Sequence, residues 1–111
     1  MEITPRHQGD VLVLDMRGRL DTSTSGKAHD AVVGFANSGA KRVVLNLDKL
    51  DFVSSAGLRV ILTLAKLLQS SSGELRICRP NANVKEVLEM SGFQSLIKIF
   101  DDEKAAIASW S

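Results

Sequence analysis

The sequence predicts a single α/β domain with a mixed, largely parallel sheet and an N-terminal hairpin at one edge. With 111 residues, the chain has room for one domain and one hydrophobic core. Hydrophobic residues make up 44% of it and aromatic residues only 5%, so the core must be mainly aliphatic. From residue 43 onward, strand-length apolar runs alternate with helical periodicities, which predicts strands joined by right-handed crossover helices.

The N-terminal third predicts the hairpin and one amphipathic helix. A short strand over residues 2–7 and a second strand over 10–18 flank a glycine suited to a hairpin turn. Asp21 and the hydroxyl residues after it could each cap a helix over residues 24–38. The apolar side chains of that segment recur at three- and four-residue spacings, so we expect one of its faces to pack on the sheet.

The middle of the chain predicts a buried strand that leads directly into a buried helix. Residues 43–47 are almost entirely apolar, which is typical of a central strand covered on both faces. Ser54 and Ser55 follow at a short turn. Residues 58–68 are apolar nearly all round apart from one polar stripe that begins at Arg59. We therefore expect this helix to pack deeply and to show solvent only one edge.

The C-terminal third repeats the alternation of strand and helix. A strand is predicted over residues 74–78, a helix over 82–90 and a last strand over 95–100. A terminal helix is expected to begin at the acidic run 101–103, since carboxylates are favourable at the positive end of a helix. The complete predicted order is β-β-α-β-α-β-α-β-α.

Charge, hydropathy and the few reactive residues argue against several classes of partner and site. A net charge of +1 with acids and bases interspersed argues against nucleic-acid and membrane partners. The N-terminus lacks a signal peptide and no apolar run approaches the ~18 residues of a membrane span, so we expect a cytoplasmic protein. Cys78, the only cysteine, is predicted to be a buried core residue. His7 and His29 lack clustered partner ligands, so no metal site is expected.

Three chemistries compete for the serine pair. A hydrolase nucleophile is disfavoured, because Val53 stands where the strained turn needs glycine and both histidines precede the serines. The chain is therefore predicted not to be an enzyme. Two interpretations remain open: the serines cap the helix, or the helix end receives a phosphate ester on one of them. Gly57 lacks a Cβ, so we expect it to let a phosphate or a partner backbone come close.

Three stretches together resemble the anti-sigma factor antagonist family, whose fold is the STAS domain. They are Gly18-Arg19-Leu20-Asp21, the apolar run 43–47 leading to Phe52-Val53-Ser54-Ser55-Ala56-Gly57-Leu58, and Val87-Leu88-Glu89-Met90-Ser91-Gly92-Phe93. The resemblance covers essentially the whole chain and implies one STAS domain over residues 1–111. The middle stretch is the specific one, and the outer two support it.

The resemblance also implies a mechanism. The unphosphorylated form would bind an anti-sigma factor that is itself a serine kinase, which releases a sigma factor or another regulator. Phosphorylation of Ser55 would switch this binding off, and a serine phosphatase would restore it. ATP would be used by the partner kinase, so no cofactor is expected for this chain alone. We expect a monomer or a weak dimer.

One departure from the family pattern concerns the residues beside the acceptor. The best-known members have an aspartate before the acceptor serine and a serine after it, where this chain has Ser54 and Ala56, so Ser54 becomes a second candidate acceptor. The alternative function is a STAS interaction subunit of a transporter or signalling complex that is not phosphorylated. The residues expected to bind a partner are Asp21, Ser54, Ser55, Ala56, Gly57 and Arg59.

Overall fold

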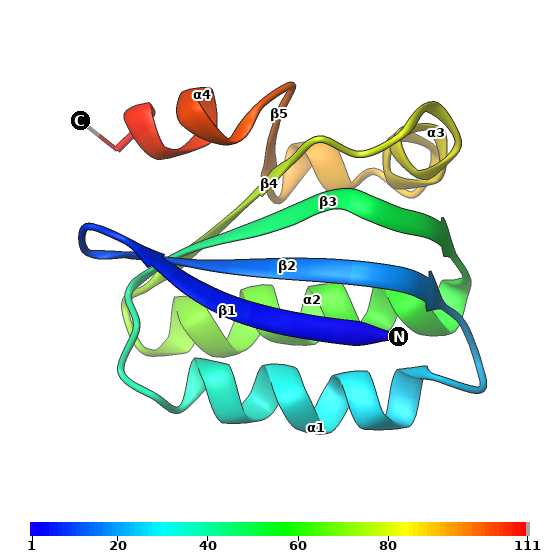
Figure 1. Ribbon diagram of the computed structural model, residues 1–111, viewed down its shortest axis with the longest axis horizontal. Helices are drawn as coiled ribbons and strands as arrows, with labels where there is room; N and C mark the ends of the chain where they lie inside the picture. Colours follow the sequence, from blue (N-terminus) through cyan, green and yellow to red (C-terminus); the bar gives the residue numbers. More distant parts are fainter. Residues whose placement is uncertain (111) are drawn as a thin grey trace.

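The computed structural model describes residues 1–110, which form one five-stranded sheet and four α-helices (Figure 1). The predicted order of elements is confirmed. The elements are β1 (Glu2–Gln8), β2 (Val11–Leu20), α1 (Ser25–Ala36), β3 (Arg42–Val53), α2 (Ser55–Ser70), β4 (Glu74–Cys78), α3 (Ala82–Met90), the 3-10 helix η1 (Phe93–Ser95), β5 (Lys98–Phe100) and α4 (Glu103–Ala108).

The sheet has the strand order β1-β2-β3-β4-β5, so neighbours in sequence are also neighbours in space. β1 pairs with β2 in an antiparallel hairpin, and every other pair is parallel. α1 and α2 lie side by side on one face, and α4 lies on the other (Figure 1). The mixed sheet with its N-terminal edge hairpin is therefore as the sequence predicted.

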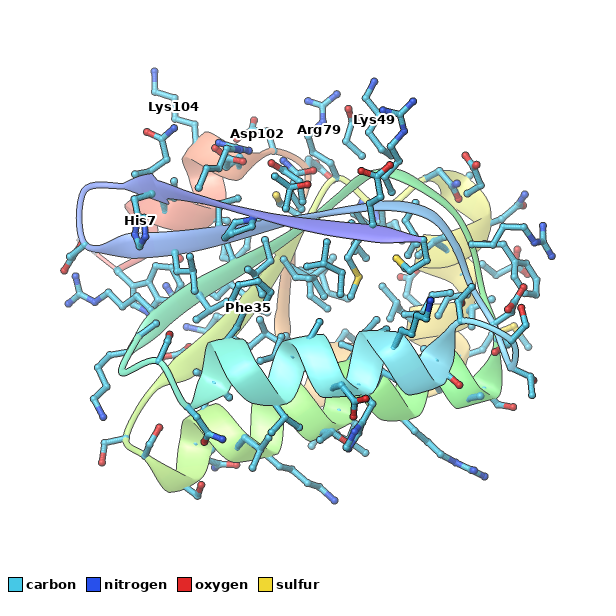
Figure 2. All side chains as sticks on the ribbon, turned by 60° about the horizontal axis from the view of Figure 1, so that its bottom comes forward. His7, Phe35, Lys49, Arg79, Asp102 and Lys104 are labelled. Atoms are coloured by element: carbon cyan, nitrogen blue, oxygen red, sulfur yellow. The ribbon has the colours of Figure 1, made fainter. Side chains whose placement is uncertain are left out.

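Two apolar clusters hold these layers together, and β3 contributes to both. Val43, Leu45 and Leu47 point into the large cluster under α1 and α2, which Phe35 of α1 also contacts (Figure 2). Val44 points to the opposite face, into the small cluster under α4. The prediction that β3 is a central strand covered on both faces is thus confirmed. Cys78 is fully buried, as expected, and burial raises the pKa of its thiol to about 12.

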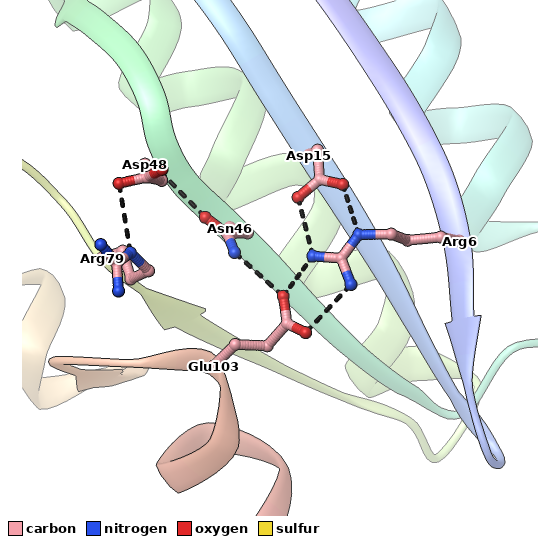
Figure 3. A network of polar contacts seen from close by, with 6 residues as sticks. All are labelled: Arg6, Asp15, Asn46, Asp48, Arg79 and Glu103. Atoms are coloured by element: carbon pink, nitrogen blue, oxygen red, sulfur yellow. Dashed lines mark hydrogen bonds and ion pairs between the residues drawn. The ribbon is translucent and has the colours of Figure 1, made fainter.

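Polar side chains tie α4 to the sheet (Figure 3). The Arg6 guanidinium on β1 donates to Asp15 on β2 (Nε–Oδ2 2.6 Å) and to Glu103 in the first turn of α4 (Nη1–Oε2 3.0 Å). The Asn46 amide on β3 donates to the same carboxylate (Nδ2–Oε1 2.9 Å). Asp102 caps the helix by accepting from the Ala105 amide at 2.7 Å. The acidic run thus begins the last helix, as predicted, and one of its acids also joins three strands to it.

Two predicted strand boundaries were wrong by three residues or more. β3 does not end at residue 47 but continues to Val53, because β2 stays paired with it through two register shifts until Leu20 meets Val53. The last strand begins at Lys98 rather than at residue 95, because Phe93–Ser95 form a 3-10 turn. Within residues 1–110, no helix is both long and apolar enough to span a membrane.

Candidate functional site

The candidate site is the turn where β3 passes into α2, beside the end of β2. Ser54 has an extended backbone, and its amide donates to the Leu20 carbonyl at 2.9 Å. Its hydroxyl accepts from the Gly57 amide at 3.2 Å, which makes Ser54 the N-cap of α2. From the sequence, either serine could cap the helix; the structure assigns that role to Ser54.

Ser55 is the first residue of α2 and is exposed to solvent. Its hydroxyl forms no hydrogen bond with any other residue in the described chain 1–110, whereas the Ser54 hydroxyl is half-buried and engaged. Ala56, next in the chain, is half-buried. The two neighbouring serines therefore differ chemically: one hydroxyl stabilises the helix end and the other is free to accept a substituent.

Gly57 is buried, and its missing side chain faces the protein itself. A Cβ built on Gly57 would lie 2.5 Å from the Leu20 carbonyl oxygen and 2.9 Å from a methyl carbon of Val53. Contacts below 3 Å are not tolerated by backbone atoms, so glycine is needed for α2 to approach the end of β2. The missing side chain thus makes room for Leu20 and Val53, and not for a phosphate or a partner backbone as predicted.

Asp21 lies directly after Leu20 and organises the turn that precedes α1. Its Oδ1 accepts from the Ser23 hydroxyl (2.7 Å), the Ser23 amide (3.0 Å) and the Thr24 amide (3.2 Å). The hydrogen bond from the Ser23 hydroxyl is the main cause that lowers the pKa of this carboxyl, so it is ionised at neutral pH. Asp21 thus caps a turn four residues ahead of α1 rather than the helix itself, which begins at Ser25 without a side-chain cap.

Sequence reasoning missed a pair of side chains beside Asp21. The Arg19 guanidinium lies 4.3 Å from the centroid of the Phe52 ring and 3.6 Å (Nε–Oδ2) from Asp21. Phe52 is 40% exposed although it is a large apolar residue. Arg19 and Phe52 are register partners near the ends of β2 and β3, after two register shifts that local sequence patterns do not reveal.

The six residues that the sequence singled out are gathered at one end of the molecule. Leu20 lies among them: it packs against Gly57, its carbonyl accepts a hydrogen bond from the Ser54 amide, and it directly precedes Asp21. Arg59 is exposed on α2, one turn after Ser55. His7 pairs with Leu12, at the other end of β2, so it lies far from this site. No histidine hydrogen-bonds to Ser55 within residues 1–110, and the geometry of a nucleophile and its base is therefore not present in the described chain.

The sequence and the fold match known proteins. The sequence profile of the STAS domain matches residues 2–106. The chain belongs to the STAS domain family. The Bordetella bronchiseptica protein BtrV, whose name describes it as an anti-sigma factor antagonist, is 34% identical over 110 residues, which are 99% of this chain and 95% of BtrV.

Solved structures of STAS domains agree with this assignment. A Thermotoga maritima protein described as an anti-sigma factor antagonist is 25% identical, with a TM-score of 0.91 over 96% of this chain and 92% of its own. The anti-sigma factor antagonist SpoIIAA in its unphosphorylated form is 20% identical, with a TM-score of 0.79 over 96% of this chain and 93% of its own. The first supports the antagonist role, and the second shows that the fold is shared.

Proposed function

We propose that this STAS domain is an anti-sigma factor antagonist whose binding is switched by phosphorylation of Ser55. In the unphosphorylated form it binds an anti-sigma factor with serine kinase activity through the surface around Asp21, Ser55 and Arg59, and so frees a sigma factor or another regulator. The observation that carries the proposal is the difference between the two serine hydroxyls. The Ser55 hydroxyl is exposed and forms no hydrogen bond within residues 1–110, whereas the Ser54 hydroxyl caps α2.

The switch works by a phosphoryl transfer from ATP, which is bound by the partner kinase, to this domain. The γ-phosphoryl group of ATP held by the kinase moves to the Ser55 Oγ, which forms the phosphate ester, releases ADP and gives up the hydroxyl proton. This domain supplies only the acceptor, so it is neither an enzyme nor the binder of a cofactor. A serine phosphatase hydrolyses the ester and restores binding. SpoIIAA, a protein with the same fold, has been solved in a phosphorylated form as well.

The energetic effect of the phosphate is large enough to act as a switch. It adds about 1.5 to 2 negative charges at a point where a neutral hydroxyl had faced the partner. An unpaired or repelled charge in an interface costs a few kcal/mol, and a loss of about 3 kcal/mol weakens binding roughly a hundredfold. The fold need not change, because the modified residue lies on the surface at the start of a helix.

Ser54 is the weaker candidate acceptor for a structural reason. Its hydroxyl accepts from the Gly57 amide and is half-buried, so a kinase could reach it only after the helix cap had opened. Its modification would also remove a contact that contributes about 1 kcal/mol to helix stability. Phosphorylation of Ser55 requires neither the opening of the helix cap nor the loss of its hydrogen bond.

The proposal is tested by incubating the protein with its cognate kinase-type anti-sigma factor and ATP, then mapping the phosphate by mass spectrometry. Ser55→Ala should abolish incorporation, whereas Ser54→Ala should still be phosphorylated at Ser55. In binding assays with ATP present, Ser55→Ala should stay bound and Ser55→Asp should bind more weakly. Absence of phosphate from both serines would refute the switch. Equal binding of Ser55→Ala and Ser55→Asp would indicate a STAS interaction subunit that works without phosphorylation.

A further inference from the structure

We infer that Arg59 holds the phosphate of modified Ser55 in an ion pair within α2, and that this contact favours the doubly charged form of the phosphate. The inference rests on the proposed phosphorylation of Ser55 and adds a residue that regulates it. It is drawn from the placement of two exposed side chains and from the distribution of charge along one helix.

The helical geometry brings the two side chains together. Ser55 is the first residue of α2 and Arg59 is four positions later, so both lie on the same face, about 5 to 6 Å apart at Cβ. Side chains in a helix lean toward its N-terminus, so the long Arg59 side chain extends over the turn that contains Ser55. Both residues are exposed, and neither needs to displace core packing to make the contact.

The charge pattern of α2 leaves Arg59 available. The helix Ser55–Ser70 contains no acidic residue, and Arg59 and Lys66 are its two cations. Within residues 1–110, Arg59 forms no ion pair, so a phosphate on Ser55 would be the first anion within one turn of it. An anion four positions before a cation is also the favourable order along a helix.

A second cation near the turn, Arg19, already contacts other side chains. Arg19 stacks on the Phe52 ring at 4.3 Å and faces the ionised carboxylate of Asp21 at 3.6 Å. A phosphate that approached Arg19 would be repelled by the Asp21 carboxylate. Arg19 could bind the phosphate only by giving up part of its contact with Asp21. Arg59 pairs with no carboxylate in the described part of the chain, so it is the better partner for the phosphate.

The consequence concerns the charge of the switched-off state. The second pKa of phosphoserine is about 6, so an isolated phosphate carries a mixture of one and two charges near neutral pH. A guanidinium that binds the phosphate favours the dianion and lowers this pKa. Arg59 would therefore increase the fraction of doubly charged phosphate on Ser55 when the pH falls slightly below neutral.

The experiment uses the full chain with phosphoserine encoded genetically at position 55, so it needs no kinase. The second pKa of the phosphate is measured by a phosphorus NMR titration in low salt. We expect a value below about 6 for the parent chain. Arg59→Gln should raise it by about 0.3, and Arg59→Lys should restore part of the difference. Lys66→Gln, the matched change at the other cation of the helix, should leave it unaltered.

Equal phosphate pKa values in the parent and in a folded Arg59→Gln chain, checked by circular dichroism, would overturn the inference. A shift of the same size in Lys66→Gln would overturn it too, since that result would show a general effect of net charge. Sodium chloride at about 1 M should reduce the difference between the parent and Arg59→Gln, because it shortens the screening length to about 3 Å. Because the phosphate is installed without the partner, these outcomes are independent of whether a kinase modifies Ser55.

Discussion

Gly57 at the start of α2 packs against Leu20 at the end of β2 so closely that no side chain fits between them. A Cβ on Gly57 would lie 2.5 Å from the carbonyl oxygen of Leu20 and 2.7 Å from its Cγ. The same carbonyl accepts from the Ser54 amide at 2.9 Å. This contact therefore fixes the serine turn relative to Asp21, the next residue along the chain.

Gly57→Ala should destabilise the fold, because the new methyl group meets a backbone oxygen that cannot move away without opening the pairing of β2 and β3. We expect the free energy of unfolding in urea to fall by about 1 to 3 kcal/mol, the usual cost of overpacking. Gly34→Ala in α1 is the matched control, since a Cβ there has open space around it. That change should be neutral or stabilising by up to about 1 kcal/mol. Equal effects of the two substitutions would contradict the close contact.

Ser54→Ala should lower the free energy of unfolding by about 1 kcal/mol, because the Gly57 amide loses the hydroxyl that caps it. Ser55→Ala should change stability by no more than about 0.5 kcal/mol, since the Ser55 hydroxyl is exposed and forms no hydrogen bond within residues 1–110. Thermal or urea unfolding of the two variants measures the difference. Greater destabilisation by Ser55→Ala would reverse the assignment of cap and free hydroxyl.

Glu103 should make stability depend on pH through its pairing with Arg6. The hydrogen bond from Arg6 is the main cause that lowers the pKa of this carboxyl in the folded protein. A carboxyl with a lowered pKa stabilises the fold above its unfolded pKa, about 4.3, and loses this contribution as the pH falls through the folded value. The contribution should therefore be complete at pH 7 and decline below about pH 4.

Glu103→Gln should cost roughly 1 to 2 kcal/mol at pH 7, because the charge-assisted hydrogen bonds are lost. The difference from the parent should narrow as the pH is lowered, since the parent carboxyl becomes neutral as well. Urea unfolding at pH 7, 4 and 3 measures this trend. Glu89→Gln is the control, because Glu89 is exposed on α3 and forms no ion pair within residues 1–110. If the difference in unfolding free energy between the parent and Glu103→Gln stays constant with pH, the pairing of Glu103 with Arg6 does not contribute to the pH dependence of stability.

The sequence by itself determined the element order, the edge hairpin and the central position of β3. These features follow from local patterns: an apolar run such as 43–47 needs cover on both faces, and the periodicity of the helices leaves one face for the sheet. Sequence also located the serine turn, since the motif around Ser54-Ser55-Ala56-Gly57 is continuous in the chain. Interactions between near neighbours carry all of this information.

Only the tertiary structure decided which serine caps α2, why residue 57 is glycine, and what surrounds Asp21. The cap itself is a local hydrogen bond, but the turn that forms it is held by the Leu20 carbonyl, which accepts from the Ser54 amide. The other two answers depend on contacts between residues distant in the chain: Leu20 against Gly57, and Arg19 against Phe52. Such contacts follow from the register of β2 on β3, which two irregularities shift before the strands end. A shift of one residue moves a side chain to the other face of a sheet, so local patterns could not specify which atoms meet at this turn.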